Sequence, residues 1–458
     1  MNLSIIILAA GQGTRMRSNM PKVLNPLGGC SLLEHVIGTS HALKPAATYV
    51  VVGHGGEHVR ILLEAYPVKW VEQAQQLGTG HAVAQAVPLI SDDHLVLVLY
   101  GDVPLISLET LQRLTDAGTK GTVGLLTAHL NDPSGYGRII RDAQGDVIAI
   151  VEHKDANDEQ RDISEINTGM LAVHAGHLKR WVSRLDNKNR QGEFYLTDVM
   201  AMAVQDGIPI ETVHPANNIE ILGVNTKAQL AELERVYQLQ QAERLMANGV
   251  TLRDPSRFDI RGELSVGRDV IIDINVVFEG KVTIGNDATI GANCYLRDVT
   301  LGDGVVIQAN SVVEESEIGA NCRVGPFARI RPGTRLASEV HIGNFVEIKK
   351  STVDNGTKIN HLSYVGDATV GARVNIGAGT ITCNYDGANK HQTVIENDVF
   401  IGSDTQIVAP VTLGAGATIG AGSTITKDTP SGELTLSRAP QQTRKGWKRP
   451  EKNQKKNQ

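Results

Sequence analysis

Short apolar runs alternate with stretches of helical character along the first half of the chain. Four of these runs have the length and the β-branched content of buried strands, at residues 5–8, 48–52, 95–100 and 123–127. Strands that alternate with helices are typical of a parallel sheet covered on both faces. The pattern therefore predicts an α/β domain with a Rossmann-like, mostly parallel sheet.

A single long helix is predicted over residues 226–246. Thr226 and Gln229 have the spacing of a capping box at its start, and Gly249 can end it. One side of the helix carries an apolar stripe, Leu230, Leu233 and Tyr237. We interpret the helix as a connector, which divides the chain into a first domain, a helical linker and a second domain at 1–226, 227–247 and 248–458.

The hydrophobic pattern changes after about residue 251. Aliphatic residues followed by small residues now recur every six positions, most clearly in the run Ile401, Ile407, Leu413, Ile419 and Ile425. A hexapeptide period marks a β-helix, in which each aliphatic side chain points into a prism-shaped interior. We expect a left-handed parallel β-helix of roughly ten coils, each of ~18 residues.

The hexapeptide period breaks once, between Ile376 and Val394. Residues 382–390 do not follow it, and a solenoid can accommodate extra residues only as a loop on one face. Such loops often carry function, so we expect this one to contribute to a site.

Composition and charge exclude several classes of protein. The net charge of −6 gives no reason to expect nucleic-acid binding, and no apolar run is long enough to cross a bilayer. No secretory signal is expected, and four scattered cysteines suggest neither disulfides nor zinc, so we expect a cytoplasmic protein. The basic stretch from Arg444 to Lys456 is interpreted as a solvated tail, with steering of an anionic cofactor as the alternative.

A glycine-rich turn follows the first predicted strand, in the sequence LAAGQGTRM at residues 8–16. Its backbone N–H groups can face phosphate oxygens, and Arg15 and Lys22 add positive charge nearby. The turn matches neither the P-loop nor the GxGxxG pattern, which disfavours an ATPase or a dinucleotide site. An ordinary glycine-rich turn with surface cations is the alternative interpretation of these residues alone.

Further segments resemble the sugar-nucleotide pyrophosphorylases, whose signature is LxxGxGTRM followed by PK. The resemblance implies nucleotide and sugar contacts from Leu8, Ala9, Ala10, Gly11 and Lys22, and uracil contacts from Gln73, Gly78 and Thr79. It also implies sugar contacts from Gly137, Glu152 and Asn167. Tyr100, Gly101 and Asp102 match a segment that carries a metal-binding aspartate, and Asn225 matches the second metal-binding position.

These residue types suit the attack of a sugar 1-phosphate on the α-phosphorus of a nucleoside triphosphate, here UTP. Such a reaction needs neutralisation of charge and in-line positioning more than it needs a proton carrier. Asp102 and Asn225 offer hard oxygen ligands for Mg²⁺. Arg15 and Lys22 are the catalytic cations expected to stabilise the triphosphate and the leaving pyrophosphate.

Nearly the whole chain, apart from the final basic tail, resembles the bifunctional bacterial N-acetylglucosamine-1-phosphate uridyltransferase/glucosamine-1-phosphate acetyltransferases. The resemblance implies that His361 is the general base of an acetyl transfer from acetyl-CoA to glucosamine 1-phosphate. It implies a sugar-phosphate pocket formed by Arg331, Lys349, Tyr364 and Asn375. It implies acetyl-CoA contacts from Ala378, Asn384, Tyr385, Ser403, Ala421 and Arg438.

The same resemblance implies a homotrimer with small-molecule substrates and no membrane insertion. Two other interpretations stay open. The first half could activate another hexose while the β-helix only regulates it, although His361 and the loop at 383–390 argue against this. The chain could also be a non-catalytic scaffold, although such a protein has no chemical need for Lys22, Asp102 and Asn225.

Overall fold

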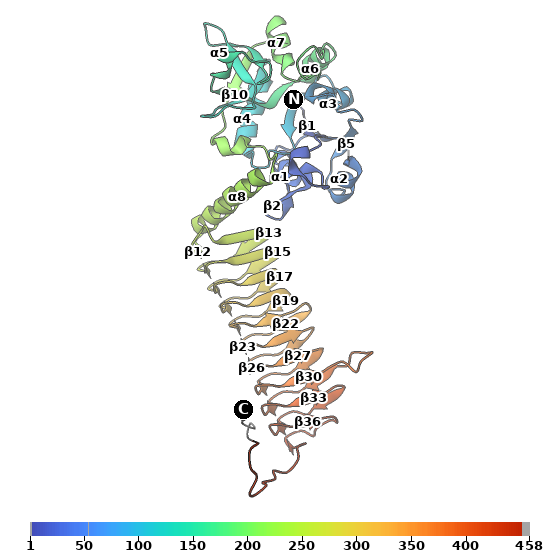
Figure 1. Cartoon of the computed structure of the whole chain (residues 1–458), viewed down its shortest axis with the longest axis vertical. Helices are drawn as coiled ribbons and strands as arrows, with labels where there is room; N and C mark the ends of the chain where they lie inside the picture. Colours follow the sequence, from blue (N-terminus) through green and yellow to red (C-terminus); the bar gives the residue numbers. More distant parts are fainter. Residues whose placement is uncertain (1, 54, 451–458) are drawn as a thin grey trace, which may run out of the picture. The chain divides into compact units, whose positions relative to one another are not determined.

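The computed structural model describes residues 2–53 and 55–450. The chain forms two compact units, residues 1–240 and 241–458 (Figure 1). Of the basic stretch noted above, residues 451–456 lie outside the described residues, while residues 444–450 are exposed. Among the helices of the described ranges, none combines the length and the apolar content needed to cross a membrane.

The first unit is built on a nine-stranded sheet in which most neighbouring strands along the main path are parallel. The strand order is β11 (Ile210–Val213), β7 (Val123–His129), β10 (Glu165–His174), β6 (Leu95–Tyr100), β1 (Leu3–Ala9), β4 (Ala47–Val52) and β5 (Lys69–Glu72). Only β10 runs antiparallel to its neighbours on this path, β6 and β7. The hairpin β8 (Arg138–Arg141) and β9 (Val147–Val151) joins the sheet through β10. The predicted α/β architecture is confirmed.

Helices cover both faces of this sheet because its central strand is apolar on both sides. Ile5 and Ile7 of β1 pack on one face with α1 (Leu32–His41) and α4 (Leu108–Thr119). Ile6 and Leu8 pack on the other face with three helices, α3 (Thr79–Ala86), α6 (Ala175–Val182) and α7 (Asp198–Gln205). Successive side chains of a strand point to opposite faces, so one continuous apolar run contributes to two cores.

The long helix α8 spans Lys227–Ala247, and the division between the two compact units falls within it. The capping box forms at its start: Gln229 N donates to Thr226 Oγ1 over 3.2 Å, and Thr226 N donates to Gln229 Oε1 over 3.1 Å. Gly249, just after the helix, has φ of 91°, the left-handed conformation that commonly ends helices.

The second unit is a parallel β-helix, as the hexapeptide pattern predicts. Ile401 pairs with Ile419 and Ile407 with Ile425, so one coil advances 18 residues. These four side chains are at most 2% exposed and belong to one continuous core. At one corner, Asn275, Asn293 and Asn310 adopt φ between 57° and 61° and form a ladder of side-chain hydrogen bonds between coils.

One coil is longer than the others. Ile376 pairs with Ile401, which lies 25 positions further along the chain. The extra residues form a loop that projects from the side of the stack next to β30 (Ile381–Cys383) (Figure 1). Its two sides meet at a bridge between Tyr385 and Lys390. The interruption of the hexapeptide pattern at 382–390 therefore corresponds to a loop, as expected.

Candidate active sites

A pocket of about 320 Å³ opens where β1 and β6 end in the first unit. The carboxyl ends of parallel strands are the usual place for ligands in open α/β sheets. The pocket is lined by ten of the residues predicted from the sequence: Leu8, Ala9, Ala10, Gly11, Lys22, Gln73, Gly78, Thr79, Tyr100 and Asp102. Gln76, Glu193, Val23 and Ala82 also line it, and the sequence did not indicate them.

The glycine-rich turn allows Lys22 to approach the pocket. Gly13 has φ of 63°, and a Cβ atom at this position would lie 2.7 Å from Lys22 Cβ. Any other residue would therefore be strained and would also displace the lysine. This turn fixes where the Lys22 side chain enters the pocket.

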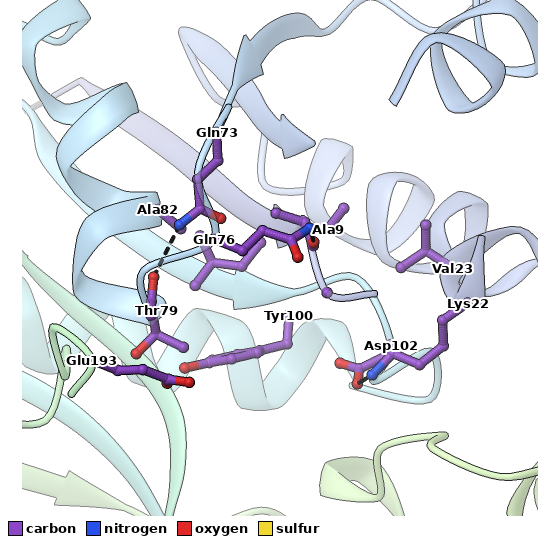
Figure 2. A pocket seen from close by; sticks show the side chains of 14 residues that line it. Ala9, Lys22, Val23, Gln73, Gln76, Thr79, Ala82, Tyr100, Asp102 and Glu193 are labelled. Carbon is purple, nitrogen blue, oxygen red and sulfur yellow. Dashed lines mark hydrogen bonds and ion pairs between the residues drawn. The ribbon is translucent and has the colours of Figure 1, made fainter. Parts of the chain in front are cut away.

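Lys22 lies at the centre of a polar network at one edge of the pocket (Figure 2). Its Nζ donates to Asp102 Oδ2 and, over 3.1 Å, to Asn225 Oδ1. Arg15 Nη2 donates to the same Asn225 oxygen over 2.9 Å. The oxygens of Asp102 and Asn225 thus converge on one cationic group, which is an arrangement that suits a hard divalent cation such as Mg²⁺.

The other side of the pocket carries amide and hydroxyl groups (Figure 2). Gln73 is 3% exposed, and its Nε2 donates to the backbone oxygen of Gly78 over 3.1 Å. Gln76 donates from its side chain to the backbone oxygen of Ala10, in the glycine-rich turn. These bonds fix the segment 73–79 against the turn. Among the described residues, the Gln73 side chain forms its hydrogen bonds through Nε2, and its Oε1 accepts none.

Glu152, Asn167 and Gly137 lie close to one another, and Asn167 lines a small pocket together with Tyr100. Asn167 N donates to the backbone oxygen of Gly137 over 2.9 Å, and a Cβ on Gly137 would lie 3.6 Å from the Glu152 carboxyl. Thr197 Oγ1 donates to Glu152 Oε1 over 3.1 Å. Burial raises the pKa of the Glu152 carboxyl, and burial also raises the pKa of the Tyr100 phenol.

His361 ends β26 (Lys358–His361) of the second unit. Its Nδ1 lies 2.7 Å from Oδ1 of Asn344, its partner on the preceding coil. An amide oxygen only accepts hydrogen bonds, so this contact puts the hydrogen on Nδ1 and leaves the lone pair on Nε2. The ring borders an open cavity of about 440 Å³ that is also lined by Phe327 and Phe345.

Cationic side chains gather on the neighbouring coils. Arg331 Nη1 donates to Glu347 Oε1 over 2.7 Å, and Lys349 extends beside Lys390 of the projecting loop. The Lys390 ammonium lowers the pKa of Lys349, and Arg331 adds to this effect. We define Arg331, Lys349 and Lys390 as the cationic cluster. In the described residues, none of these three side chains forms a hydrogen bond to His361, whose ring contacts Asn344.

The loop is tied to the coil below it through Asn384 and Asp367. Asn384 Nδ2 donates to Asp367 Oδ2 over 2.6 Å and reaches the Tyr364 hydroxyl at 3.5 Å. Tyr385, next in the chain, is 60% exposed, and its hydroxyl donates to the backbone oxygen of Gly387. The structure therefore brings Tyr364 and Asn384 together but leaves Tyr385 facing solvent.

The predicted acetyl-CoA residues include a column of small side chains. Asp404 N donates to the backbone oxygen of Ala378 over 2.7 Å, and Gly422 N donates to that of Ser403 over 2.8 Å, so positions 378, 403 and 421 stack on successive coils. Arg438 Nη1 donates to the backbone oxygen of Ala421 over 2.7 Å, which brings a cation to the end of this column. Asn375, which was predicted for the sugar pocket, lies outside this column. It belongs to β29 (Asn375–Ile376) and pairs with Lys358 and Phe400 on the adjacent coils.

Sequence reasoning missed two residues of this second centre, Asn344 and Lys390. Asn344 precedes His361 by 17 positions, about one coil, so the coil period could have indicated it. Lys390 lies in the segment where the period breaks, and only the fold shows that the loop returns it to Lys349.

Comparisons with known proteins match both units. The MobA-like NTP transferase domain matches residues 5–249, the GMPPB C-terminal domain matches residues 260–353, and the bacterial transferase hexapeptide (six repeats) matches residues 392–427. The NTP transferase match agrees with the mostly parallel sheet of the first unit, and the hexapeptide match agrees with the β-helix of the second.

Curated relatives match over nearly the whole chain. The Bifunctional protein GlmU of Methylococcus capsulatus is 58% identical over 453 residues, covering 99% of this chain and 98% of that protein. The protein of the same name from Stutzerimonas stutzeri is 59% identical and covers 99% and 100%. The one from Pseudomonas putida strain GB-1 is 58% identical over 455 residues, with the same coverage. The chain therefore belongs to the family of bifunctional GlmU proteins.

Proposed function

We propose that this chain makes UDP-N-acetylglucosamine by two successive transfers. The second unit transfers an acetyl group from acetyl-CoA to glucosamine 1-phosphate. The first unit then transfers a uridylyl group from UTP to N-acetylglucosamine 1-phosphate and releases pyrophosphate. The observation that carries the proposal is the oriented His361 in the same β-helix as the cationic cluster, because a β-helix that only regulates a pyrophosphorylase needs neither.

In the acetyl transfer, the cationic cluster binds the phosphate of glucosamine 1-phosphate. Arg331 is suited to this because its guanidinium can form paired hydrogen bonds to phosphate oxygens. His361 Nε2 accepts a proton from the sugar ammonium, and the free amine attacks the thioester carbonyl. His361 passes this first proton to solvent. The C–N bond then forms, and His361 takes the second proton from the attacking nitrogen. As the C–S bond breaks, His361 gives this second proton to the leaving thiolate. Tyr364 and Asn375 complete the sugar pocket.

Acetyl-CoA lies along the column at Ala378, Ser403 and Ala421. Small side chains there let the backbone approach the pantetheine arm. Arg438, held at Ala421, supplies positive charge for the phosphates of the coenzyme. Asn384 and the exposed Tyr385 contact it from the loop.

In the uridyl transfer, Gln73, Gly78 and Thr79 bind the uracil, and Gly137, Glu152 and Asn167 bind the sugar. An oxygen of the sugar phosphate attacks the α-phosphorus of UTP, and the bond to pyrophosphate breaks. Arg15 and Lys22 stabilise the negative charge on the triphosphate and on the pyrophosphate. Leu8 to Gly11 and Gly101 provide close backbone approach to the nucleotide.

Asp102 and Asn225 would hold the Mg²⁺ ion that this chemistry uses. When bound, the ion neutralises phosphate charge. The same two oxygens contact the Lys22 ammonium in this structure, so a metal held there would take its place and would leave Lys22 free to bind the phosphates.

We also propose that the chain acts as a homotrimer in the cytoplasm, where UTP and acetyl-CoA are available. The rings of Phe327 and Phe345 are exposed on the β-helix and stack 5.4 Å apart. Such an exposed apolar surface supports contact of this part of the β-helix with further copies of the chain. The proposed domain limits remain 1–226, 227–247 and 248–458.

A coupled assay of the purified chain tests the proposal. The mixture contains glucosamine 1-phosphate, acetyl-CoA, UTP and Mg²⁺, and free thiol and pyrophosphate are followed separately. We expect both products, with pyrophosphate released only after acetylation. Pyrophosphate from supplied N-acetylglucosamine 1-phosphate without any thiol release would instead indicate a pyrophosphorylase with a regulatory β-helix.

A further inference from the structure

Three side chains with metal-binding atoms meet at one end of the sheet in the first unit. His129 ends β7 and pairs with Glu165, which begins β10. His214 follows β11, whose last residue pairs with Leu126 of β7. Ligand atoms of His129, Glu165 and His214 all lie within 4.8 Å of one another.

Both imidazoles present a nitrogen that is able to bind a metal. His214 Nδ1 lies 3.1 Å from the backbone oxygen of Thr127 and 3.3 Å from the Thr127 hydroxyl. When Nδ1 donates to that backbone oxygen, Nε2 keeps its lone pair. His129 Nδ1 lies 3.3 Å from the Ser164 hydroxyl, which can accept from it in the same way. The two rings are 5.6 Å apart between centroids, and both residues are exposed, so an ion can reach them from solvent.

Glu165 is buried and held in a fixed orientation. Arg141 donates to its two oxygens, from Nε to Oε2 over 2.8 Å and from Nη2 to Oε1 over 2.6 Å, and Thr127 Oγ1 donates to Oε1 over 3.0 Å. Burial acts to raise the pKa of Glu165, but the hydrogen bonds from Arg141 and Thr127 outweigh it and lower the pKa. Within the part of the chain that the structure describes, Oε2 accepts a single hydrogen bond, so one of its acceptor sites stays available.

We propose that His129, Glu165 and His214 form a binding site for a divalent transition metal of the Zn²⁺ class. Imidazole nitrogens favour Zn²⁺, Ni²⁺ or Cu²⁺ over Mg²⁺, whereas Asp102 and Asn225 offer oxygens alone. Arg141 and Ser164 act as outer partners that orient the ligands, as is usual for metal-binding histidines and carboxylates. Three protein ligands leave a coordination position open to water or a small anion. The site is independent of the two proposed transfers.

The test uses the full-length chain without an affinity tag, in excess Mg²⁺ so that oxygen-only sites are occupied. Zn²⁺ is titrated in competition with a chromophoric chelator. We expect one equivalent to bind, and both His129→Ala and His214→Ala to weaken it by at least about tenfold, the scale on which even outer-sphere changes alter affinity. His58→Ala is the matched control, because it removes an exposed histidine of α2 (Gly56–Leu62) outside the cluster.

Electron paramagnetic resonance of bound Cu²⁺ provides a second measurement. Coupling to two imidazole nitrogens is expected for the wild type and His58→Ala, and coupling to one for each of the other two variants. Both cluster histidines are exposed, so circular dichroism should stay unchanged. Wild-type Zn²⁺ affinity in both cluster variants, or equal weakening in the control, would overturn the proposal.

Discussion

At His361, the contact between Nδ1 and Asn344 Oδ1 leaves Nε2 as the nitrogen that can take a proton. We expect His361→Ala to lower acetyl transfer by about 10²–10⁴-fold, the usual contribution of a positioned base. Asn344→Asp keeps an acceptor at Nδ1 but adds a negative charge that stabilises the protonated ring, so the acidic limb of the pH profile should move to higher pH. Thiol release over a pH series measures both effects. An unshifted profile for Asn344→Asp would argue against this contact.

In the first unit, the proposed metal site depends on Asp102. The Lys22 ammonium donates both to its carboxylate and to the Asn225 side-chain oxygen. Asp102→Ala should lower uridyl transfer by roughly 10²–10³-fold, the range for removing one group that stabilises developing charge. Acetyl transfer should be unchanged. Pyrophosphate release at several Mg²⁺ concentrations is the measurement, with Asp116→Ala, an exposed position of α4, as the control. Full activity of Asp102→Ala at ordinary Mg²⁺ would mean that the metal ligands are elsewhere.

Single residues were predictable from the sequence where a motif fixes their spacing. Lys22 and Asp102 are 80 positions apart, yet each stands in a recognisable segment, and the structure joins them. Gln76 and Glu193 reach the same pocket from segments without such a motif. Their position depends on where loops cross the end of the sheet, which no local pattern specifies.

Among the elements, the β-helix depends on apolar positions that face its interior. Ile401 is completely buried and pairs with Ile376 and Ile419 on the adjacent coils, whereas its neighbour Phe400 points outward and is 50% exposed. Ile401→Ala should therefore lower the free energy of unfolding of this unit by about 2–5 kcal/mol. Phe400→Ala, at the matched outward position, should cost far less.

Urea unfolding can assign this loss to one unit. Two of the three tryptophans, Trp70 and Trp181, lie in residues 1–240, and the third, Trp447, is already 67% exposed in the folded protein. Tryptophan fluorescence therefore largely follows the first unit, while far-ultraviolet circular dichroism also follows the β-helix. Ile401→Ala should move the circular dichroism transition of the β-helix to lower urea and leave the fluorescence transition in place. Equal shifts for the two variants would contradict the inward and outward assignment.

The elements show which patterns are sufficient for prediction. The apolar runs predicted β1, β4, β6 and β7, and the six-residue period predicted the β-helix, because each period corresponds to one geometry. The antiparallel direction of β10 was not predictable, since a strand buried on both faces has the same apolar run in either direction. The loop at 382–390 was expected from the broken period, but its contact with Lys349 depends on the fold.

For the whole molecule, the two centres use different residues in separate compact units, so each should work when the other is disabled. A mixture of His361→Ala and Asp102→Ala chains tests this directly. Neither variant alone should convert glucosamine 1-phosphate into UDP-N-acetylglucosamine. The mixture should do so, because Asp102→Ala releases N-acetylglucosamine 1-phosphate and His361→Ala consumes it.

The time course of this mixture distinguishes a free intermediate from a directly transferred one. A freely diffusing intermediate must first accumulate to a concentration near the KM of the uridyl transfer, so pyrophosphate should appear after a lag that shortens as His361→Ala is added. Supplying N-acetylglucosamine 1-phosphate from the start should abolish the lag. Product from the wild type but none from the mixture would mean that the intermediate passes between centres without leaving the protein, and the two units would then form one coupled catalyst.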